Sequence, residues 1–337
     1  MKIICLTILV VLLITPVRAE KIAVLEEIMK PNMFDVGDER IVITERASIY
    51  IYSLKDFHLI KKFGKEGEGP REFQIVPLGP PMVALPYKGK IYVSSQSKVS
   101  VFTNRGEFIR ESRVLPFQVY RPFGDKFLFT ATGTDEKDRA VLSVNLANEK
   151  FEKQKELYLS DMTTGPAIKL DYPMTSFNFV PYKDRIYLAA GKEGFAIDVF
   201  DGNGTKLYRV KKEYERLPVP DEYKKKTKEW FQTNPAYRQF WEFFKDRISF
   251  KTHYPAIQRM LVTDDRIFVL TYKQKDGKTE CIVMNLKGEE EKRVFVPMEW
   301  LMGMDFYPRS DIYKGNWYTL IENVDEETWE LHRMKLL

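Results

Sequence analysis

Six copies of one short strand pattern follow each other along the chain. Each copy begins with an Asp, Gly or charged residue and contains three or four short strands of alternating apolar residues, separated by polar breaks and turns. The pattern is clearest in the second strand of each copy, at residues 40–43, 90–93, 126–129, 185–188, 266–269 and 316–319. Repeats of several short strands are typical of propeller blades. The repeat therefore predicts an all-β fold, a six-bladed β-propeller.

The last predicted blade is one strand short. The six blades are expected at residues 33–63, 81–114, 119–159, 177–214, 257–296 and 304–337. Lys21 to Ile28 has the pattern of a single strand and belongs to no other blade. We expect this N-terminal strand to complete blade six, because pairing it there closes the ring and covers an exposed strand edge.

Residues 1–19 have the pattern of a signal peptide. The apolar run at 3–14 is too short to span a bilayer, and Val17 and Ala19 supply the small residues that signal peptidase reads. We therefore expect cleavage before Glu20 and an exported protein, periplasmic or secreted. The alternative is a signal anchor that stays in place.

The charge and the cysteine content limit the kinds of partner, membrane anchor and chemistry that we expect. The chain has 53 Lys and Arg against 48 Asp and Glu, spread without long runs, so we expect no nucleic-acid partner. Cys5 precedes the apolar run instead of closing it, so we expect no lipoprotein and no lipid anchor. Cys281 lies in an apolar stretch, which favours a buried thiol over a nucleophile. Residues 20–337 should form one domain.

A glycine-rich segment at residues 63–73 reads Phe-Gly-Lys-Glu-Gly-Glu-Gly-Pro-Arg-Glu-Phe. It resembles the Gly-Pro-x-Glu-Phe turn of NHL-type six-bladed propellers, which include many exported bacterial proteins of uncharacterised families. The resemblance extends to the order of the blades and to a helical segment before blade five that is followed by His253 to Ile257. Only the first blade junction carries the full glycine motif. The resemblance implies an extracytoplasmic propeller and brings no catalytic residues with it.

Three further motifs have a structural and a chemical interpretation. Gly64, Gly67 and Gly69 fit neither the dinucleotide motif nor the P-loop, which favours a turn between blades over a phosphate site. Asp201 to Thr205 alternates oxygen side chains as a calcium loop does, but it lacks the later glutamate, which favours a hairpin turn. The three histidines are far apart in the sequence. We expect no metal, no cofactor and no catalytic triad.

The strand pattern stops in residues 217–250, and a helical pattern replaces it. A second helix is predicted to begin at Asn234 as N-cap and Pro235 as first residue. This insertion between blades four and five could be a helical hairpin packed on a blade edge or face, a lid over the channel, or a surface for a partner. The residues proposed for a partner surface are the aromatic ones, Trp230, Phe231, Tyr237, Phe240, Trp241 and Phe244.

The innermost strands of a propeller face one another across the axis, so their central residues should line a channel. These residues are predicted to be Asp35, Ala84, Arg121, Asn178, Arg259 and Asp305. The two arginines and two aspartates could neutralise each other in a wet channel. Alternatively, the arginines bind a carboxylate or sulfate of a ligand or peptide terminus. A one-residue slip in strand register would turn each of these side chains away.

The sequence thus supports two classes of function. We expect a monomeric, exported, non-catalytic propeller that binds a protein, peptide or glycan through its faces and helical insertion. The alternative is an enzyme of the lactonase, lyase or hydrolase kind with its site at the propeller channel. A lactonase needs several oxygen ligands around a metal ion, whereas the predicted channel contains arginines. No membrane span is expected.

Overall fold

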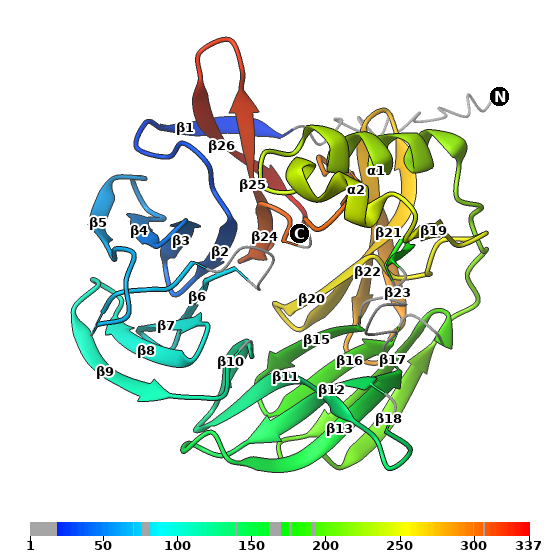
Figure 1. Cartoon of the computed structure of the whole chain (residues 1–337), viewed down its shortest axis with the longest axis horizontal. Coiled ribbons are helices and arrows are strands. Elements are labelled where there is room, and N and C mark those ends of the chain that lie inside the picture. Colours follow the sequence, from blue (N-terminus) through cyan, green and yellow to red (C-terminus); the bar gives the residue numbers. More distant parts are fainter. Residues whose placement is uncertain are drawn as a thin grey trace, which may run out of the picture.

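The computed structural model shows a ring of four-stranded sheets around a central axis (Figure 1). It describes residues 19–337 except 70, 76–80, 117, 139, 162–169, 175–176, 191–192, 299 and 306. The predicted signal peptide therefore lies, apart from Ala19, outside the described residues. Within them the chain forms six antiparallel blades and one extra two-stranded sheet, which confirms the predicted six-bladed β-propeller.

Each of the first five blades consists of four consecutive strands. Blade one contains β2 (Met33–Gly37), β3 (Arg40–Glu45), β4 (Ser48–Ser53) and β5 (Leu59–Phe63). Blade two contains β6 (Val83–Tyr87), β7 (Lys90–Ser95), β8 (Lys98–Thr103) and β9 (Phe108–Arg113). Blade three contains β10 (Tyr120–Phe123), β11 (Lys126–Thr134), β12 (Ala140–Ala147) and β13 (Lys153–Asp161). Blade four contains β15 (Phe177–Tyr182), β16 (Arg185–Ala190), β17 (Ala196–Asp201) and β18 (Lys206–Lys211). Blade five contains β20 (Arg259–Thr263), β21 (Arg266–Lys275), β22 (Lys278–Asn285) and β23 (Glu290–Val296).

Blade six is assembled from both ends of the described chain. It contains β24 (Ser310–Tyr313), β25 (Asn316–Asn323), β26 (Thr328–Lys335) and, as its outermost strand, β1 (Glu20–Leu25). β1 lies antiparallel to β26, with Lys21 Nζ 2.9 Å from Glu330 Oε1 (Figure 1). This pairing confirms the predicted closure of the ring by the N-terminal strand.

Tight turns join the inner strand of each blade to its second strand. In blade one the two-residue loop Asp38-Glu39 has φ of 50° and 60°, and in blade five Asp264-Asp265 has φ of 51° and 56°. Positive φ at both central residues is the geometry of a hairpin turn whose twist matches that of the strands. These turns fix the register of the inner strands and hence which side chains face the axis.

The apolar core is divided among the contacts between neighbouring blades. One cluster joins Ile41 and Ile43 of blade one to Tyr318, Leu320 and Leu331 of blade six. Similar clusters lie between other neighbouring blades of the ring. Because every blade packs on its neighbours, a long chain can bury its apolar side chains without a single oversized core.

The insertion contains less helix than the sequence predicts. It has one regular helix, α1 (Asp221–Thr233), followed by the 3₁₀ turn η3 (Arg238–Phe240) and the short α2 (Trp241–Phe244). The prediction of a regular helix starting at Asn234 is wrong. Asn234 Oδ1 accepts a hydrogen bond from Ala236 N (3.0 Å), so the chain makes an Asx turn at that point before the 3₁₀ segment.

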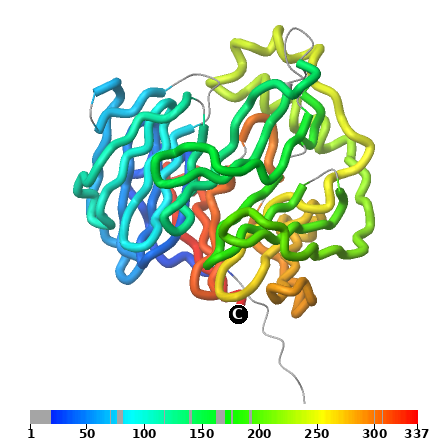
Figure 2. The backbone as a smooth tube through the Cα atoms, turned by 90° about the horizontal axis from the view of Figure 1, so that it is seen from below, coloured from blue at the N-terminus to red at the C-terminus, as the bar shows by residue number. Residues whose placement is uncertain are grey.

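The insertion lies on one face of the ring, where Figure 2 shows it in yellow-green. A parallel ribbon of β14 (Leu170–Tyr172) and β19 (Ile248–Phe250) ties it to the segment between blades three and four. The Tyr172 hydroxyl donates to the Gly303 carbonyl (2.9 Å) and the Tyr223 hydroxyl to the Leu301 carbonyl (3.4 Å). The insertion therefore packs on the segment that precedes blade six.

Candidate functional site

A cavity of about 640 Å³ follows the axis of the propeller. All six inner strands contribute to its lining, and Tyr172, Tyr223, Tyr272 and Gly303 line it beside the insertion. A concave, mostly apolar space with a few convergent polar groups is the usual form of a ligand site. The cavity is therefore the candidate functional site.

The structure brings most of the predicted channel residues together. Asp35, Arg121, Asn178 and Arg259 lie on the inner strands β2, β10, β15 and β20 and all line the cavity. The sixth predicted residue, Ala84, is buried within β6. The charged residues that the sequence pattern placed around the axis thus share one space.

Asp305 is not on an inner strand, so its predicted strand position is wrong. β24 begins only at Ser310, and Asp305 lies in the preceding segment, where its carboxylate pairs with Arg309 (3.1 Å). It still lines the cavity. Blade six was expected to begin at Met304, whereas its first strand, β24, begins at Ser310.

Asp311 occupies the inner-strand position of blade six, and sequence reasoning missed it. Counting back from the second strand finds it, because Asp311 precedes Asn316 by five residues as Asp35 precedes Arg40. The Asp311 carboxylate accepts hydrogen bonds from Val36 N (2.9 Å) and Ile312 N (2.8 Å). It therefore fastens blade six to blade one.

Arg259 and Asn178 also hold neighbouring blades together. Arg259 Nη1 donates to the Ser310 carbonyl oxygen (2.7 Å) and to Ser310 Oγ (3.1 Å) in blade six. Asn178 Oδ1 accepts a hydrogen bond from Met260 N (3.4 Å) of blade five. Both side chains therefore have protein partners that a ligand would have to share.

Arg121 has no such partner. Its guanidinium lies over the Phe179 ring, 5.6 Å from the centroid, and no acceptor among the described residues makes a hydrogen bond or ion pair with it. The Asp35 carboxyl likewise has no hydrogen bond to the described part of the chain. Arg121 and Asp35 are the charged groups of the inner strands that the cavity leaves open to a ligand.

The electrostatics of the cavity favour an anion. Burial, and then the charge of Asp311, raise the pKa of Asp35 well above its usual range, while Arg121 and Arg259 oppose this shift. Burial also raises the pKa of Asp311, against the effect of Arg259. Asp305 and Lys183 also line the cavity, and each has an ion-pair partner, Arg309 and Asp265 respectively. Arg121 is the lining cation that has neither a hydrogen bond nor an ion pair among the described residues, and low-dielectric walls strengthen its attraction for an anion.

Gln258, the residue before β20, is a further polar group of the cavity wall. The residue is only 4% exposed, and neither Nε2 nor Oε1, both fully buried, has a hydrogen-bond partner among the described residues. No sequence signal identifies it, because its isolation depends on the packing of segments that are far apart in the chain. Buried side-chain amides nearly always have partners, so this one is unusual.

The aromatic residues of the insertion mostly face inward. Phe231 and Phe244 are buried in a cluster with Tyr172, Tyr223 and Tyr254, so they cannot belong to a partner surface in this conformation. The remaining predicted partner residues are partly buried and pack against the same cluster: Trp230, Tyr237, Phe240 and Trp241. These aromatic residues thus chiefly form the core of the insertion.

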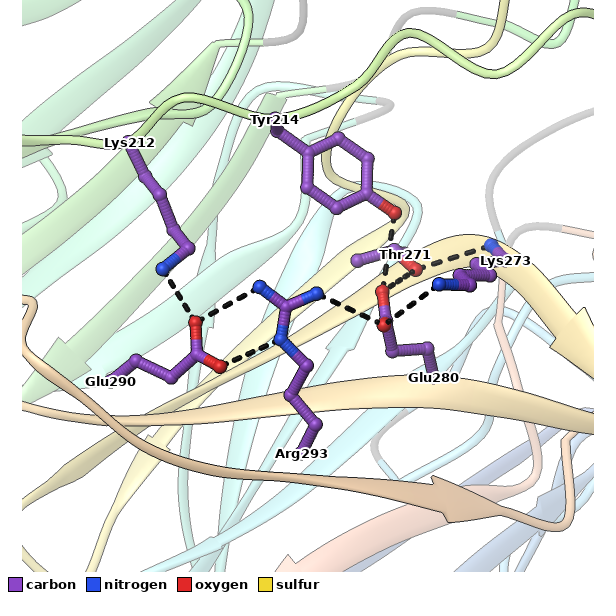
Figure 3. Close-up of polar contacts among 7 residues, drawn as sticks. All are labelled: Lys212, Tyr214, Thr271, Lys273, Glu280, Glu290 and Arg293. Atoms are coloured by element: carbon purple, nitrogen blue, oxygen red, sulfur yellow. Dashed lines mark hydrogen bonds and ion pairs between the residues drawn. The ribbon is translucent and has the colours of Figure 1, made fainter.

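A network of charged groups lies outside the cavity, between blades four and five (Figure 3). Glu280, 2% exposed, accepts hydrogen bonds from Tyr214 Oη (3.2 Å), Thr271 Oγ1 (3.0 Å) and Arg293 Nη1 (3.3 Å). Arg293 also pairs with Glu290 (2.6 Å). Because each carboxylate has donors within the chain, the network anchors the start of the insertion and offers no free group to a ligand.

The other motifs have structural roles. In the glycine segment Phe73 N donates to the Lys65 carbonyl (2.9 Å) and Gly69 N to Glu72 Oε2 (3.0 Å), which makes a turn between blades one and two. The Asp201 carboxylate accepts hydrogen bonds from the chain within the turn from β17 to β18, which confirms the predicted hairpin.

Three observations concern the reactive cysteine, the metal site and the membrane span, none of which the sequence predicts. Burial raises the pKa of the Cys281 thiol to about 12. Among the described residues no three His, Cys, Asp or Glu side chains are grouped to hold a metal ion. No helix in the same part of the chain is long and apolar enough to cross a bilayer.

Comparison with known proteins finds similar solved structures but no similar family or curated sequence. No family model and no curated protein matches the chain. Similar solved structures include a luciferin-regenerating enzyme (7% identity, TM-score 0.43, 95% of each chain covered). Others are the β-propeller domain of Cps50 (Swd1) from Myceliophteria thermophila (9%, 0.41, 94% of this chain and 99% of that one) and a protein of unknown function from Bacteroides caccae (9%, 0.41, 79% and 81%). The chain is a six-bladed β-propeller on the evidence of its own sheets.

Proposed function

We propose that this chain is an exported, non-catalytic propeller of the NHL-like type that binds a ligand in its axial cavity. The observation that carries the proposal is Arg121, an inner-strand guanidinium that faces the cavity without an acceptor among the described residues. An arginine fork matches a carboxylate or sulfate in geometry and charge, and such charge-assisted pairs are strong. The ligand is therefore expected to be anionic.

The groups around Arg121 are held in place by other contacts, which suits a preformed binding site. Contacts between blades hold Asp311 and Arg259 in place, and the Phe179 ring supports the guanidinium itself. A site that is already rigid loses little conformational entropy when a ligand arrives. One ion pair and the contacts with the apolar walls can therefore contribute to the affinity for a ligand with little cost of ordering the site.

The insertion supplies one end of the proposed site. Tyr172 and Tyr223 line the cavity, and their hydroxyls hold the segment at Leu301 and Gly303. A protein, peptide or glycan ligand approaching this face would meet the insertion before the inner strands. The insertion then acts as the rim of the site, and its aromatic core keeps that rim in position.

Export is part of the proposal and follows from the pattern of residues 1–19. Cleavage before Glu20 is compatible with the fold, since β1 begins at Glu20 and Arg333 Nη2 donates to its carboxylate (2.5 Å). The mature chain would keep the whole closing strand.

A ligand screen read by thermal shift tests the proposal. Wild type and Arg121→Ala are each mixed with carboxylates, sulfated sugars and short peptides, with Arg113→Ala, an exposed arginine of β9, as the matched control. We expect at least one anionic ligand to raise the melting temperature of wild type and of the control but not of Arg121→Ala. Equal shifts in all three proteins would show that binding occurs elsewhere. No shift in any of them would remove the support for a cavity ligand.

A further inference from the structure

Two carboxyl groups of the cavity, Asp35 and Asp311, meet where blade one contacts blade six. Asp311 Oδ2 accepts a hydrogen bond from Val36 N (2.9 Å), the amide that directly follows Asp35. Asp311 has a second donor in Ile312 N (2.8 Å), whereas Asp35 has no hydrogen bond to the described part of the chain. Backbone N–H donors stabilise the ionised form of a carboxyl, and two neighbouring carboxylates repel each other. When the pair holds one proton, that proton therefore belongs on Asp35.

Two arginines face this pair from other blades. Arg259 of β20 donates to the Ser310 carbonyl (2.7 Å), next to Asp311, and Arg121 of β10 lines the same cavity. Burial, and then the charge of Asp311, raise the pKa of Asp35, while both arginines oppose the rise. The Asp35 carboxyl is only partly buried, so it can exchange a proton with water in the cavity.

The other charged groups of the lining already have partners. Asp305 pairs with Arg309 (3.1 Å), and Lys183 pairs with Asp265 (2.5 Å). The remaining ionisable groups of the lining are tyrosine hydroxyls, including those of Tyr307 and Tyr313. Asp35 is therefore the carboxyl of the lining that has no donor among the described residues.

The charge of Asp35 changes what an anion meets at Arg121. An ionised Asp35 repels the anion and competes with it for the attraction of the arginines, whereas a protonated Asp35 does neither. At an effective dielectric constant of about 20, repulsion between like charges about 7 Å apart corresponds to roughly 10- to 100-fold in affinity. Such coupling is reciprocal, so an anion that binds the protonated form more tightly also makes the site hold that proton more tightly.

We infer, on the basis of the proposed function, that the cavity binds its anion together with a proton, the anion at Arg121 and the proton at Asp35. The affinity for the anion is then highest in acid, where Asp35 is already neutral. It falls as pH rises through the range in which Asp35 ionises in the free protein, and it levels off once Asp35 is ionised in the complex as well. The site therefore takes up anions in acid and releases them as the acidity falls.

Calorimetric titration from pH 4 to 9 tests the inference. The probes are inorganic sulfate and glucose 6-sulfate, which keep their charge over this range, and hexanoate, which stays ionised above about pH 6. With wild type, the Kd of each sulfate should rise about 10- to 100-fold from the acid to the alkaline limit. Cationic buffers of different ionisation enthalpies are used, because buffer anions would compete. The dependence of the measured heat on the buffer should show proton uptake with the anion.

Asp35→Asn cannot ionise, so it identifies the group that takes up the proton. This variant should bind the sulfates at every pH about as tightly as wild type does in acid, and it should take up no proton. Asp125→Asn, in the exposed turn between β10 and β11, is the matched control and should show the pH dependence of wild type. In wild type, the carbon-13 shift of the Asp35 carboxyl checks the same assignment without a substitution. Addition of sulfate should move it toward the protonated value.

The other outcomes distinguish the inference from the proposed function. If a sulfate or hexanoate binds in a way that depends on Arg121, but with one Kd at every pH and no proton uptake, the inference is overturned and the anion site stands. If proton uptake persists in Asp35→Asn, another group holds the proton and the inference is again overturned. If none of the three anions depends on Arg121 for binding, both the inference and the proposed function fail.

Discussion

At the scale of single residues, the two arginines of the cavity differ in what they contact. Arg259 donates two hydrogen bonds to Ser310, whereas Arg121 lies over the Phe179 ring and makes no hydrogen bond or ion pair among the described residues. The same residue type therefore holds the ring together at one position and is open to a ligand at the other. Sequence reasoning gave both arginines the same role, because their partners come from blades that are distant in the chain.

The first prediction compares these two residues in the absence of ligand. Arg259→Ala is expected to lower the free energy of unfolding by about 1–3 kcal/mol, because the Ser310 carbonyl loses its donor and Asp311 loses a compensating charge. Arg121→Ala is expected to cost about 1 kcal/mol or less, the scale of a cation–π contact, because it breaks no hydrogen bond or ion pair among the described residues. Urea denaturation measures both. Equal losses would mean that Arg121 is also structural.

The second prediction concerns Asp35, whose pKa is raised by burial and by Asp311. The folded protein holds this proton more tightly than the unfolded chain, so the stabilisation is complete below the unfolded pKa of about 3.9 and is lost as pH rises through the folded pKa. Asp35→Asn should therefore match wild type near pH 4 and become the more stable protein as pH rises. Melting temperatures from pH 4 to 8 test this, and a constant difference between the proteins would contradict it.

At the scale of elements, the strands could be predicted because the same kind of hydrogen-bonded turn recurs from blade to blade. Asn148, Asp201 and Asn285 each accept two backbone N–H groups in the turn from the third to the fourth strand of a blade. Such turns, alternating apolar residues and two-residue hairpins are all local signals. The inner strand of blade six lacked them on its N-terminal side, which is why Asp305 was placed where Asp311 lies.

The third prediction concerns the closing strand. Lys21, and then Asn323 and His332, lower the pKa of Glu330 to about 2. The folded protein therefore binds this proton less tightly than the unfolded chain, and the stabilisation is present above pH about 4.3 and fades as pH falls toward 2. Glu330→Gln should melt at a lower temperature than wild type at pH 7, and the difference should shrink between pH 5 and 2. Glu327→Gln, in the exposed turn of the same hairpin, is the control. A difference that persists at pH 2 would contradict the assignment.

At the scale of the whole molecule, hydrogen bonds between turns link neighbouring blades. Gly89 N donates to Asp38 Oδ2 (2.6 Å), and Gly315 N donates to Asp264 Oδ2 (2.8 Å). The Tyr87 hydroxyl accepts from Gly124 N (2.7 Å). These contacts fasten neighbouring blades to one another around the ring. The unpaired amide of Gln258 and the buried aromatic stripe of the insertion arise at this scale, so no local pattern could predict them.

The fourth prediction concerns export. If residues 1–19 are a signal peptide, protein recovered from outside the cytoplasm should have an intact mass that begins at Glu20. The mature protein should fold into the six-bladed ring described above, because β1 begins at that residue. Recovery of the full-length chain embedded in a membrane would favour the signal-anchor alternative.

A crystal structure of the wild-type protein with the anionic ligand that gives the largest thermal shift tests the central claim most directly. The account predicts that the ligand lies in the axial cavity, with its anionic oxygens within about 3 Å of the Arg121 guanidinium nitrogens and the Arg259 contact to Ser310 unchanged. A ligand bound on the outer strands, or one in the cavity whose anionic group avoids Arg121, would contradict it.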